Sequence, residues 1–338
     1  MDLPRFYIQK SERIQAKYRK RTTLNKQVKS LLINEKIMKI LVTGGTGLIG
    51  RTFIESSLAS GAEYEFTVLT RDVSKAKQNL KDEVSIIDNL AQVNMANFDV
   101  ALNLAGEPIV NKRWTEQQKR TLCQSRWQLT EQLVNKINRE CNADNPIRFI
   151  SGSAVGIYGR QPKGLITETH SPHFPEFSHT LCQRWEDIAL QAKHANVALL
   201  RTGIVLSHSG GALDKMLLPF KLGLGGKIAS GEQFMPWIHI DDMVAGIQFL
   251  IDHPVLNGPF NFTAPHPVTN AEFAKTLAKS LNRPCLFPVP EFVLRLIMGE
   301  MADLLVYGQN ASPENLVKAG FNFKYETLKP ALDEVVSH

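Results

Sequence analysis

Three glycines in the segment 38–50 are spaced for binding a phosphate group. They stand at positions 44, 47 and 50, directly after a short apolar run and before an apolar helical pattern. A buried strand would end there and a helix begin, so free N–H groups and the positive end of the helix dipole would favour a pyrophosphate. The spacing is GxxGxxG, and the alternative interpretation is a turn that needs glycine for structure alone. The cofactor-binding residues predicted in this turn are Gly44, Thr46, Gly47, Leu48, Ile49 and Gly50.

The second apolar segment ends in Thr70-Arg71, where a site that prefers NAD usually has an acid to bind the ribose 2′-hydroxyl. A guanidinium at this place suits a 2′-phosphate, because its planar fork donates two hydrogen bonds to a dianion. We therefore predict NADP(H) as the cofactor. Asp72 complicates this prediction, and a solvated Arg71 on the surface is the alternative.

Two later segments place small and hydroxyl-bearing residues where the cofactor would lie. Leu104, Ala105 and Gly106 stand at the end of the apolar segment 98–104 and leave room for the ribose and adenine. The segment 150–159 carries Ser151, Ser153 and Tyr158 beside the expected nicotinamide position. We predict Ser151 as a cofactor-binding residue.

The order of apolar segments indicates how these residues are positioned. Strand patterns alternate with helical ones up to about residue 206, which predicts a doubly wound, Rossmann-type α/β domain whose parallel sheet is covered on both faces. Ligands bind such sheets beyond the carboxyl ends of the strands. The pattern is irregular after residue 206, and we predict a smaller C-terminal, substrate-side lobe over 204–338 beside an NADP-binding domain over 38–203. The expected strands are 39–43, 65–70, 84–88, 98–104, 147–151 and 197–202, and the expected helices are 48–60, 115–140, 178–195, 269–281 and 290–298.

Charge is distributed unevenly along the 338 residues. The net charge is +6, yet residues 1–37 hold ten Lys and Arg against three acids. Residues 38–338 therefore hold 29 basic and 30 acidic residues, which does not favour a nucleic-acid surface. We interpret 1–37 as an unstructured basic extension, with a targeting arm as the alternative.

Cysteine usage and hydropathy give the expected compartment. The four cysteines are far apart and form no CxxC pair, which is typical of reduced thiols in a cytoplasmic protein. No apolar run approaches the roughly 18 residues that span a bilayer. No metal site is indicated by the His, Cys and acid spacings. The expected partner is a small-molecule substrate, with neither nucleic acid nor membrane, and a homodimer is left open.

Seven ordered motifs resemble one family. The chain resembles the extended and atypical short-chain dehydrogenase/reductases, and more narrowly the nucleotide-sugar epimerases of the YfcH type. This resemblance implies NADPH binding, with Thr70-Arg71 and Leu104-Ala105 at the cofactor and Arg126 near its phosphates or ribose. The motifs are NLAGEPI (103–109), KRW (112–114), CQSRW (123–127), SGSAVGIYG (151–159), LPFKLGLGGKIASG (218–231), WIHIDDM (237–243) and GQNASPENLVKAGF (308–321).

The residues for proton transfer depart from the superfamily pattern. The resemblance implies a Ser and a Tyr-x-x-x-Lys, but counting back from Glu186 puts Ser178 at the Tyr position and Cys182 at the Lys position. Tyr158 could supply the phenol with Ser153 orienting a substrate oxygen, or His179 could be the acid/base, because its ordinary pKa of about 6.5 suits neutral pH. The remaining alternative is that the site performs no hydride chemistry.

Further residues near the expected cleft have structural alternatives. His239 could reach the substrate, Asp242 could cap the helix that follows it, and Arg201 could bind an anionic substrate or form a structural ion pair. We interpret the glycine-rich loop 222–231 as a close-packed lid or edge segment rather than a second phosphate site. The sequence thus predicts an NADP(H)-binding reductase or epimerase that acts on a nucleotide sugar or a small carbonyl compound. The alternative is an NADPH-binding regulatory or sensor protein without turnover.

Overall fold

The computed structural model of the protein describes residues 37–161, 164–171 and 173–337. The chain divides into two units, Met1–Met38 and Lys39–His338, and every element after the first strand belongs to the second. The basic extension predicted for residues 1–37 lies outside the described residues except for Ile37. Its role therefore stays a prediction.

Seven parallel strands form the central sheet, in the order β10-β6-β5-β4-β1-β2-β3. Strand β1 lies in the interior of the sheet. Strands β2 and β3 follow on one side of it, and β4, β5, β6 and β10 follow in that order on the other. The reversal of strand order beside β1 is the position where doubly wound sheets bind ligands. The predicted Rossmann-type fold is confirmed. The strands are β1 (Met38–Thr43), β2 (Tyr64–Leu69), β3 (Ser85–Ile87), β4 (Val100–Asn103), β5 (Ile147–Ala154), β6 (Ala195–Thr202) and β10 (Gly258–Phe262).

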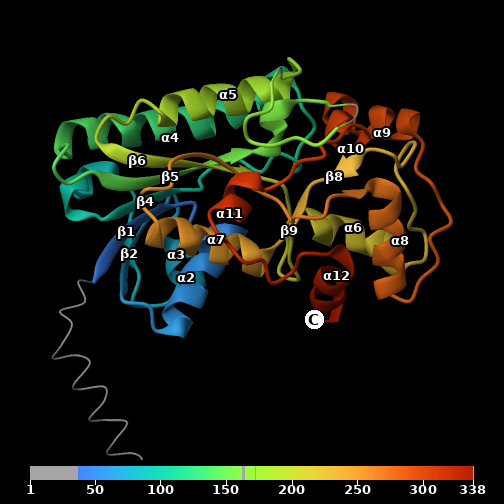
Figure 1. The fold of residues 1–338 in the computed structure, drawn as a ribbon, viewed down its shortest axis with the longest axis horizontal. Coiled ribbons are helices and arrows are strands. Elements are labelled where there is room, and N and C mark those ends of the chain that lie inside the picture. The colour runs from blue at the N-terminus through green and yellow to red at the C-terminus, as the bar shows by residue number, and fades with distance from the viewer. Residues whose placement is uncertain (1–36, 162–163, 172, 338) are drawn as a thin grey trace, which may run out of the picture. The chain divides into compact units, whose positions relative to one another are not determined.

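Helices cover both faces of this sheet (Figure 1). Helices α4 and α5 pack together on one face, whereas α2 and α7 pack together on the other, where α3 also lies. Leu41, Phe149 and Leu199 are fully buried in the apolar core beneath α4 and α5. The helices are α2 (Leu48–Ser60), α3 (Val73–Asn79), α4 (Glu116–Glu140), α5 (Phe177–Ala189) and α7 (Ile240–Asp252).

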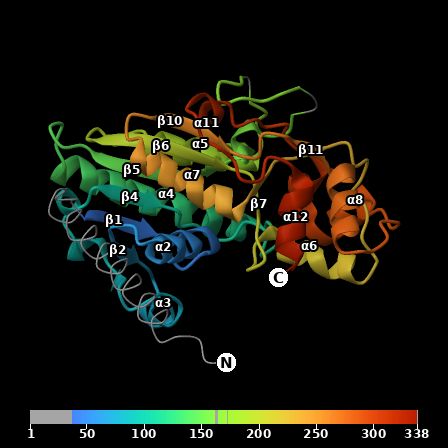
Figure 2. The same cartoon turned by 60° about the horizontal axis from the view of Figure 1, so that its bottom comes forward.

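The C-terminal part has an apolar core of its own. Trp237, Phe273 and Leu332 are buried in it, and α6, α8 and α12 surround it, as Figure 2 shows. Two short strand pairs join this part to the end of the sheet: β7 (Ile204–Leu206) with β9 (Trp237–His239), and β8 (Phe234–Met235) with β11 (Val268–Thr269). The helices are α6 (Ala212–Lys221), α8 (Asn270–Ser280), α9 (Glu291–Met298), α10 (Asp303–Val306), α11 (Glu314–Lys318) and α12 (Leu328–Ser337).

Two elements from the range predicted as the C-terminal lobe belong to the sheet layer. Helix α7 packs on α2, and β10 pairs with β6 from Gly258 to Phe262. Arg148 on β5 binds the connection between α7 and β10. Its side chain is buried and donates to the carbonyls of Leu250 (2.9 Å) and Leu256 (2.7 Å). The sheet is therefore completed only by residues beyond 257. The division into 38–203 and 204–338 stays a prediction.

Candidate functional site

The turn between β1 and α2 is close-packed against its surroundings. Gly44 has a φ of 74°, and a Cβ on it would lie 2.7 Å from the carbonyl carbon of Leu104. A Cβ on Gly50 would lie 2.5 Å from the carbonyl oxygen of Gly44. Gly47 caps α2 without a side-chain hydrogen bond, so the first N–H groups of the helix, at Leu48, Ile49 and Gly50, have no side-chain cap. This geometry fits an anion such as a pyrophosphate.

A row of polar residues crosses the carboxyl ends of β1, β4 and β5. Thr43, Asn103 and Ser151 are neighbours in the strand register. The Thr43 hydroxyl donates to Asn103 Oδ1 (2.7 Å), and Asn103 Nδ2 donates to Ser151 Oγ (3.2 Å) and to Thr130 Oγ1 on α4 (2.8 Å). Ser151 is fully buried. The row therefore joins the ends of the three strands through buried hydrogen bonds, and contact of Ser151 with a cofactor stays a prediction.

Arg126 lies against the loop that follows β4. Its guanidinium donates to the carbonyls of Glu107 (3.0 Å) and Leu122 (3.1 Å) and stacks over Trp185 at 5.3 Å. A Cβ on Gly106 would lie 2.9 Å from the guanidinium carbon, so the glycine permits this approach. Burial lowers the pKa of Arg126. Contact of Arg126 with a cofactor stays a prediction.

The end of β2 carries the residues predicted to distinguish NADP from NAD. The Asp72 carboxylate accepts a hydrogen bond from the Lys75 amide (2.9 Å) and caps α3. Arg71 is exposed, and no described carboxylate forms an ion pair with it. Asp72 therefore has a structural role that does not use the guanidinium, and the Arg71 charge is available to a ligand.

A second polar row, across β5, β6 and β10, is held by a buried ion pair. Ser153, Arg201 and Asn261 are register neighbours. Arg201 donates to both carboxylate oxygens of Glu186 on α5, at 2.9 and 2.8 Å. Burial alone would lower the pKa of Arg201, but the hydrogen bonds and charge of Glu186 raise it above its ordinary value. The structural alternative for Arg201 is thus the one observed.

Two predicted catalytic residues belong to this row. The Ser153 hydroxyl donates to Glu186 (2.6 Å), and the Tyr158 hydroxyl donates to Asn261 (2.7 Å) and accepts from Arg201 (3.0 Å). Tyr158 is 0% exposed, and burial raises the pKa of its phenol. Both hydroxyls are engaged inside the protein, which favours the packing role of Tyr158 over the catalytic one. The partners of the Tyr158 hydroxyl are side chains of β6 and β10.

Helix α5 begins with the residues at the superfamily's Tyr and Lys positions. Ser178 is buried and donates to Glu176 (2.8 Å), and Cys182 is buried with a thiol pKa raised by burial to about 12. Neither side chain is a proton carrier at neutral pH. His179 is half-buried, and its Nδ1 contacts the Ile157 carbonyl at 2.5 Å. Because a carbonyl oxygen only accepts, Nδ1 is the donor in that contact and Nε2 is the acceptor nitrogen of the neutral ring.

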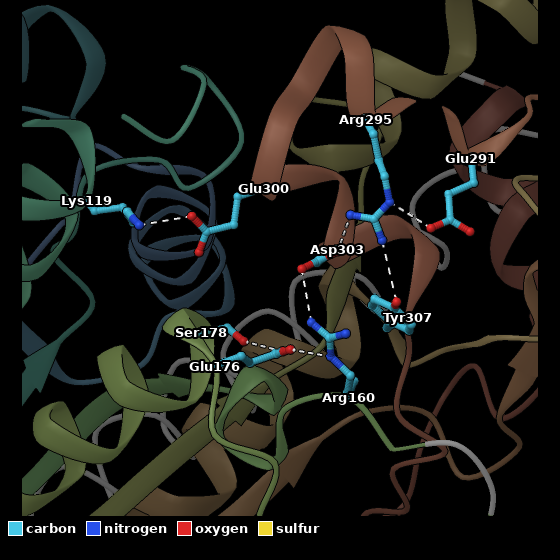
Figure 3. Close-up of polar contacts among 9 residues, drawn as sticks. All are labelled: Lys119, Arg160, Glu176, Ser178, Glu291, Arg295, Glu300, Asp303 and Tyr307. Carbon is cyan, nitrogen blue, oxygen red and sulfur yellow. Dashed lines mark hydrogen bonds and ion pairs between the residues drawn. The ribbon is translucent and has the colours of Figure 1, made fainter. Parts of the chain in front are cut away.

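A charged network ties the segment 291–307 to the start of α5 (Figure 3). Arg160 donates to Glu176 (3.0 Å) and to Asp303 (3.1 Å), and Arg295 donates to the other oxygen of Asp303 (2.9 Å). Lys119 on α4 pairs with Glu300 at 2.9 Å. Through Glu176 this network also holds Ser178. The C-terminal part is thereby anchored beside the residues that start α5.

The roles of His239 and Asp242 differ from those expected. His239, not Asp242, caps α7: its Nδ1 accepts from the Asp241 amide (3.1 Å), and Nε2 contacts Glu334 (2.8 Å). Asp242 instead accepts from the amides of Lys324 (2.6 Å) and Tyr325 (2.9 Å). Both side chains are about 1% exposed, so the structure favours a structural role for His239 over contact with a substrate.

Comparison with known proteins identifies the family. The model of the NAD dependent epimerase/dehydratase family matches residues 40–262, a range that includes all or most of each of the seven strands of the sheet. The chain belongs to this family. A second model, a domain of unknown function (DUF1731), matches residues 289–335.

Relatives of this epimerase-family chain match it along most of its length. The Arabidopsis thaliana epimerase family protein SDR39U1 homolog, chloroplastic, is 37% identical over 89% of this chain and 88% of its own. The crystal structure of human epimerase family protein SDR39U1 (isoform2) with NADPH has a TM-score of 0.80 at 32% identity, covering 89% of this chain and 99% of the human one. A nucleoside-diphosphate sugar epimerase from Corynebacterium glutamicum has a TM-score of 0.69 at 27% identity, covering 90% and 59%.

Several residues of this epimerase-family site were not predicted from the sequence. Gly45 is one, because a Cβ on it would lie 2.9 Å from the Val68 side chain. Asn103 gave a usable signal, since it is the first polar residue after a run of apolar ones. Glu168 gave none: it lies in a loop and accepts from the Asn261 amide (2.9 Å), and burial raises the pKa of its carboxyl group.

Proposed function

We propose that this protein binds NADP(H) along the carboxyl edge of its sheet and acts as an oxidoreductase or epimerase of the atypical short-chain class. The pyrophosphate would lie at the turn from Gly44 to Gly50, and the 2′-phosphate at Thr70-Arg71. The observation that carries the preference for NADP(H) is the position of Asp72, which caps α3 and leaves Arg71 without a carboxylate partner among the described residues. The human relative crystallised with NADPH supports the same cofactor.

We expect Arg71→Ala to weaken NADPH binding by about 10- to 100-fold, because a charge-assisted hydrogen bond contributes about 1.5–3 kcal/mol. Affinity for NADH should stay within twofold, since NADH lacks the 2′-phosphate. The measurement is a fluorescence titration of wild type and variant with both cofactors. Lys193→Ala, an exposed cation elsewhere in the chain, is the control. Equal losses for NADPH and NADH would contradict the assignment of Arg71.

The chemistry would combine hydride transfer from the bound cofactor with proton transfer by the chain. Of the three predicted catalytic residues, His179 is the one with a ring nitrogen free to accept a proton, because Ser153 and Tyr158 are held by Glu186, Arg201 and Asn261. The substrate that we propose is a nucleotide sugar or a small carbonyl compound. The named activity of the Corynebacterium glutamicum relative supports the former.

His179→Gln is expected to reduce turnover by about 10²- to 10⁴-fold, the usual contribution of a positioned acid/base. NADPH affinity should be unchanged, since the ring lies at α5 and not at the glycine turn. The assay screens UDP-sugars, dTDP-sugars and small carbonyl compounds for NADPH oxidation or epimer formation. The matched control is His266→Gln, the same change at an exposed histidine. Turnover that survives in His179→Gln and disappears in Tyr158→Phe would assign the proton to the phenol.

A second candidate function is an NADPH-binding regulatory protein. It is favoured by the burial of Ser178 and Cys182, which leaves the superfamily's two proton-transfer positions without a titrating group at neutral pH. Tight NADPH binding with no turnover on any compound, together with a change in protease sensitivity on binding, would support this function over the enzymatic one.

A further inference from the structure

A groove in the C-terminal part carries four positive charges. Lys275 and Lys279 come from α8, and Lys227 and Arg283 come from the segments on either side of it. The groove has a volume of about 670 Å³, within the range of small-molecule sites. Its lining residues all come from 226–288, so it is separate from the glycine turn at 44–50.

The wall opposite α8 is built by two hydrogen-bonded segments. The Val289 amide donates to the Lys227 carbonyl (2.9 Å), and the Ala229 amide donates to the Val289 carbonyl (2.9 Å). A Cβ on Gly226 would lie 2.1 Å from the Phe287 carbonyl oxygen, so only glycine permits this approach. The glycine-rich loop 222–231 thus serves to form a fixed wall, and it brings Lys227 to the groove.

The four cations have no carboxylate partners within the described part of the chain. Lys227 donates to the Ser230 carbonyl (3.0 Å) and Arg283 to the Lys221 carbonyl (2.9 Å). No described carboxylate forms an ion pair with any of the four, and no acid lines the groove. Asp333, whose pKa Lys279 helps to lower, is already bound by Lys329 and Ser280.

Four like charges around one groove repel one another, and an anion of high charge density relieves that repulsion. Phosphate groups have this charge density, and they take hydrogen bonds from ammonium and guanidinium groups alike. We propose that this groove is a second ligand site, separate from the cofactor, that binds a phosphate- or diphosphate-bearing group. The group belongs either to a soluble phosphorylated compound or to a lipid headgroup. The lipid is included because Leu286, which lines the groove, is 70% exposed and could contact acyl chains.

The test uses inorganic pyrophosphate as the soluble probe. Its binding is measured by calorimetry at low ionic strength, where charge attraction is least screened. The lipid arm measures sedimentation with phosphatidylcholine vesicles that contain phosphatidylglycerol, against vesicles without it. Both arms compare the full chain with Lys275→Glu/Lys279→Glu and with the control Arg139→Glu/Lys193→Glu. The two residues changed in each variant are exposed. Any binding of pyrophosphate at the glycine turn would have the same affinity in all three proteins. Thermal unfolding verifies that each protein is folded.

We expect saturable binding that is at least tenfold weaker in Lys275→Glu/Lys279→Glu and within twofold of wild type in the control. Loss of pyrophosphate binding assigns the site to a soluble compound, whereas loss confined to the phosphatidylglycerol vesicles assigns it to a lipid headgroup. Binding that is unchanged in Lys275→Glu/Lys279→Glu, equally reduced in both double variants, or absent with both probes overturns the proposal. These outcomes are independent of Arg71, so they leave the proposed cofactor site unaffected.

Discussion

Glu186→Gln is expected to lower the free energy of unfolding by about 3–5 kcal/mol, the typical cost of removing one partner from a buried ion pair. The substitution keeps the side-chain volume but leaves the Arg201 guanidinium, which is 7% exposed, without its counter-charge. It also weakens the acceptor of the Ser153 hydroxyl. Since whole domains are stable by only about 5–15 kcal/mol, the loss should be evident in a chemical denaturation curve.

Two further variants separate this effect from a loss of packing. Glu131→Gln makes the same chemical change at an exposed position of α4 and should change stability by less than about 0.5 kcal/mol. Glu186→Leu/Arg201→Met removes both charges and should recover much of the lost stability, because a buried pair replaced by apolar side chains is often close to neutral. A loss below about 1 kcal/mol in Glu186→Gln would show that water or another anion compensates the Arg201 guanidinium.

Gly50→Ala should weaken NADPH binding by about 10- to 100-fold. A Cβ at this position lies 2.5 Å from the Gly44 carbonyl oxygen and 2.9 Å from the Gly45 Cα, and both are backbone atoms that cannot move without opening the turn. Overpacking of this kind costs about 1–3 kcal/mol, and a turn that relaxes to avoid it no longer presents its N–H groups correctly. The measurement is the same fluorescence titration.

Gly61→Ala is the matched control, because Gly61 ends the same helix with a φ of 74° and a Cβ on it meets nothing within 4 Å. It should cost some stability through its left-handed backbone and leave NADPH affinity unchanged. Unchanged affinity in Gly50→Ala as well would mean that the turn is structural and that the dinucleotide binds elsewhere.

The parts of the fold that depend on local pattern were predictable from the sequence. Apolar runs that alternate with helical ones gave six of the sheet strands, with small differences at their ends: the helix expected over 178–195 stops at Ala189, for example. Strand β10 was missed because Gly-Pro-Phe-Asn-Phe is short and begins with two residues typical of turns. Its place in the sheet depends on β6, which is more than fifty residues earlier in the chain.

The candidate site likewise has one part that the sequence predicts and another that it does not. The glycine turn and Thr70-Arg71 were predictable because their chemistry lies within a few consecutive residues. The environments of Tyr158, Ser153 and Arg201 depend on the register of β5, β6 and β10 and on the face that α5 presents to them. Nothing local to Tyr158 indicates that Asn261, over a hundred residues later, will accept a hydrogen bond from its hydroxyl. Residue type alone therefore did not show that the hydroxyls of Ser153 and Tyr158 have hydrogen-bond partners inside the protein.

The late pairing of β10 has a consequence for synthesis on the ribosome. Until residue 262 has emerged, β6 is an open edge with unpaired N–H and C=O groups, and Arg148 lacks the carbonyls of Leu250 and Leu256 that will bind it. Such an edge is a template for association with other chains. The nascent chain thus passes through an interval in which β1 to β6 have been synthesised while β6 still lacks its partner strand, and association with other chains is most favourable in that interval.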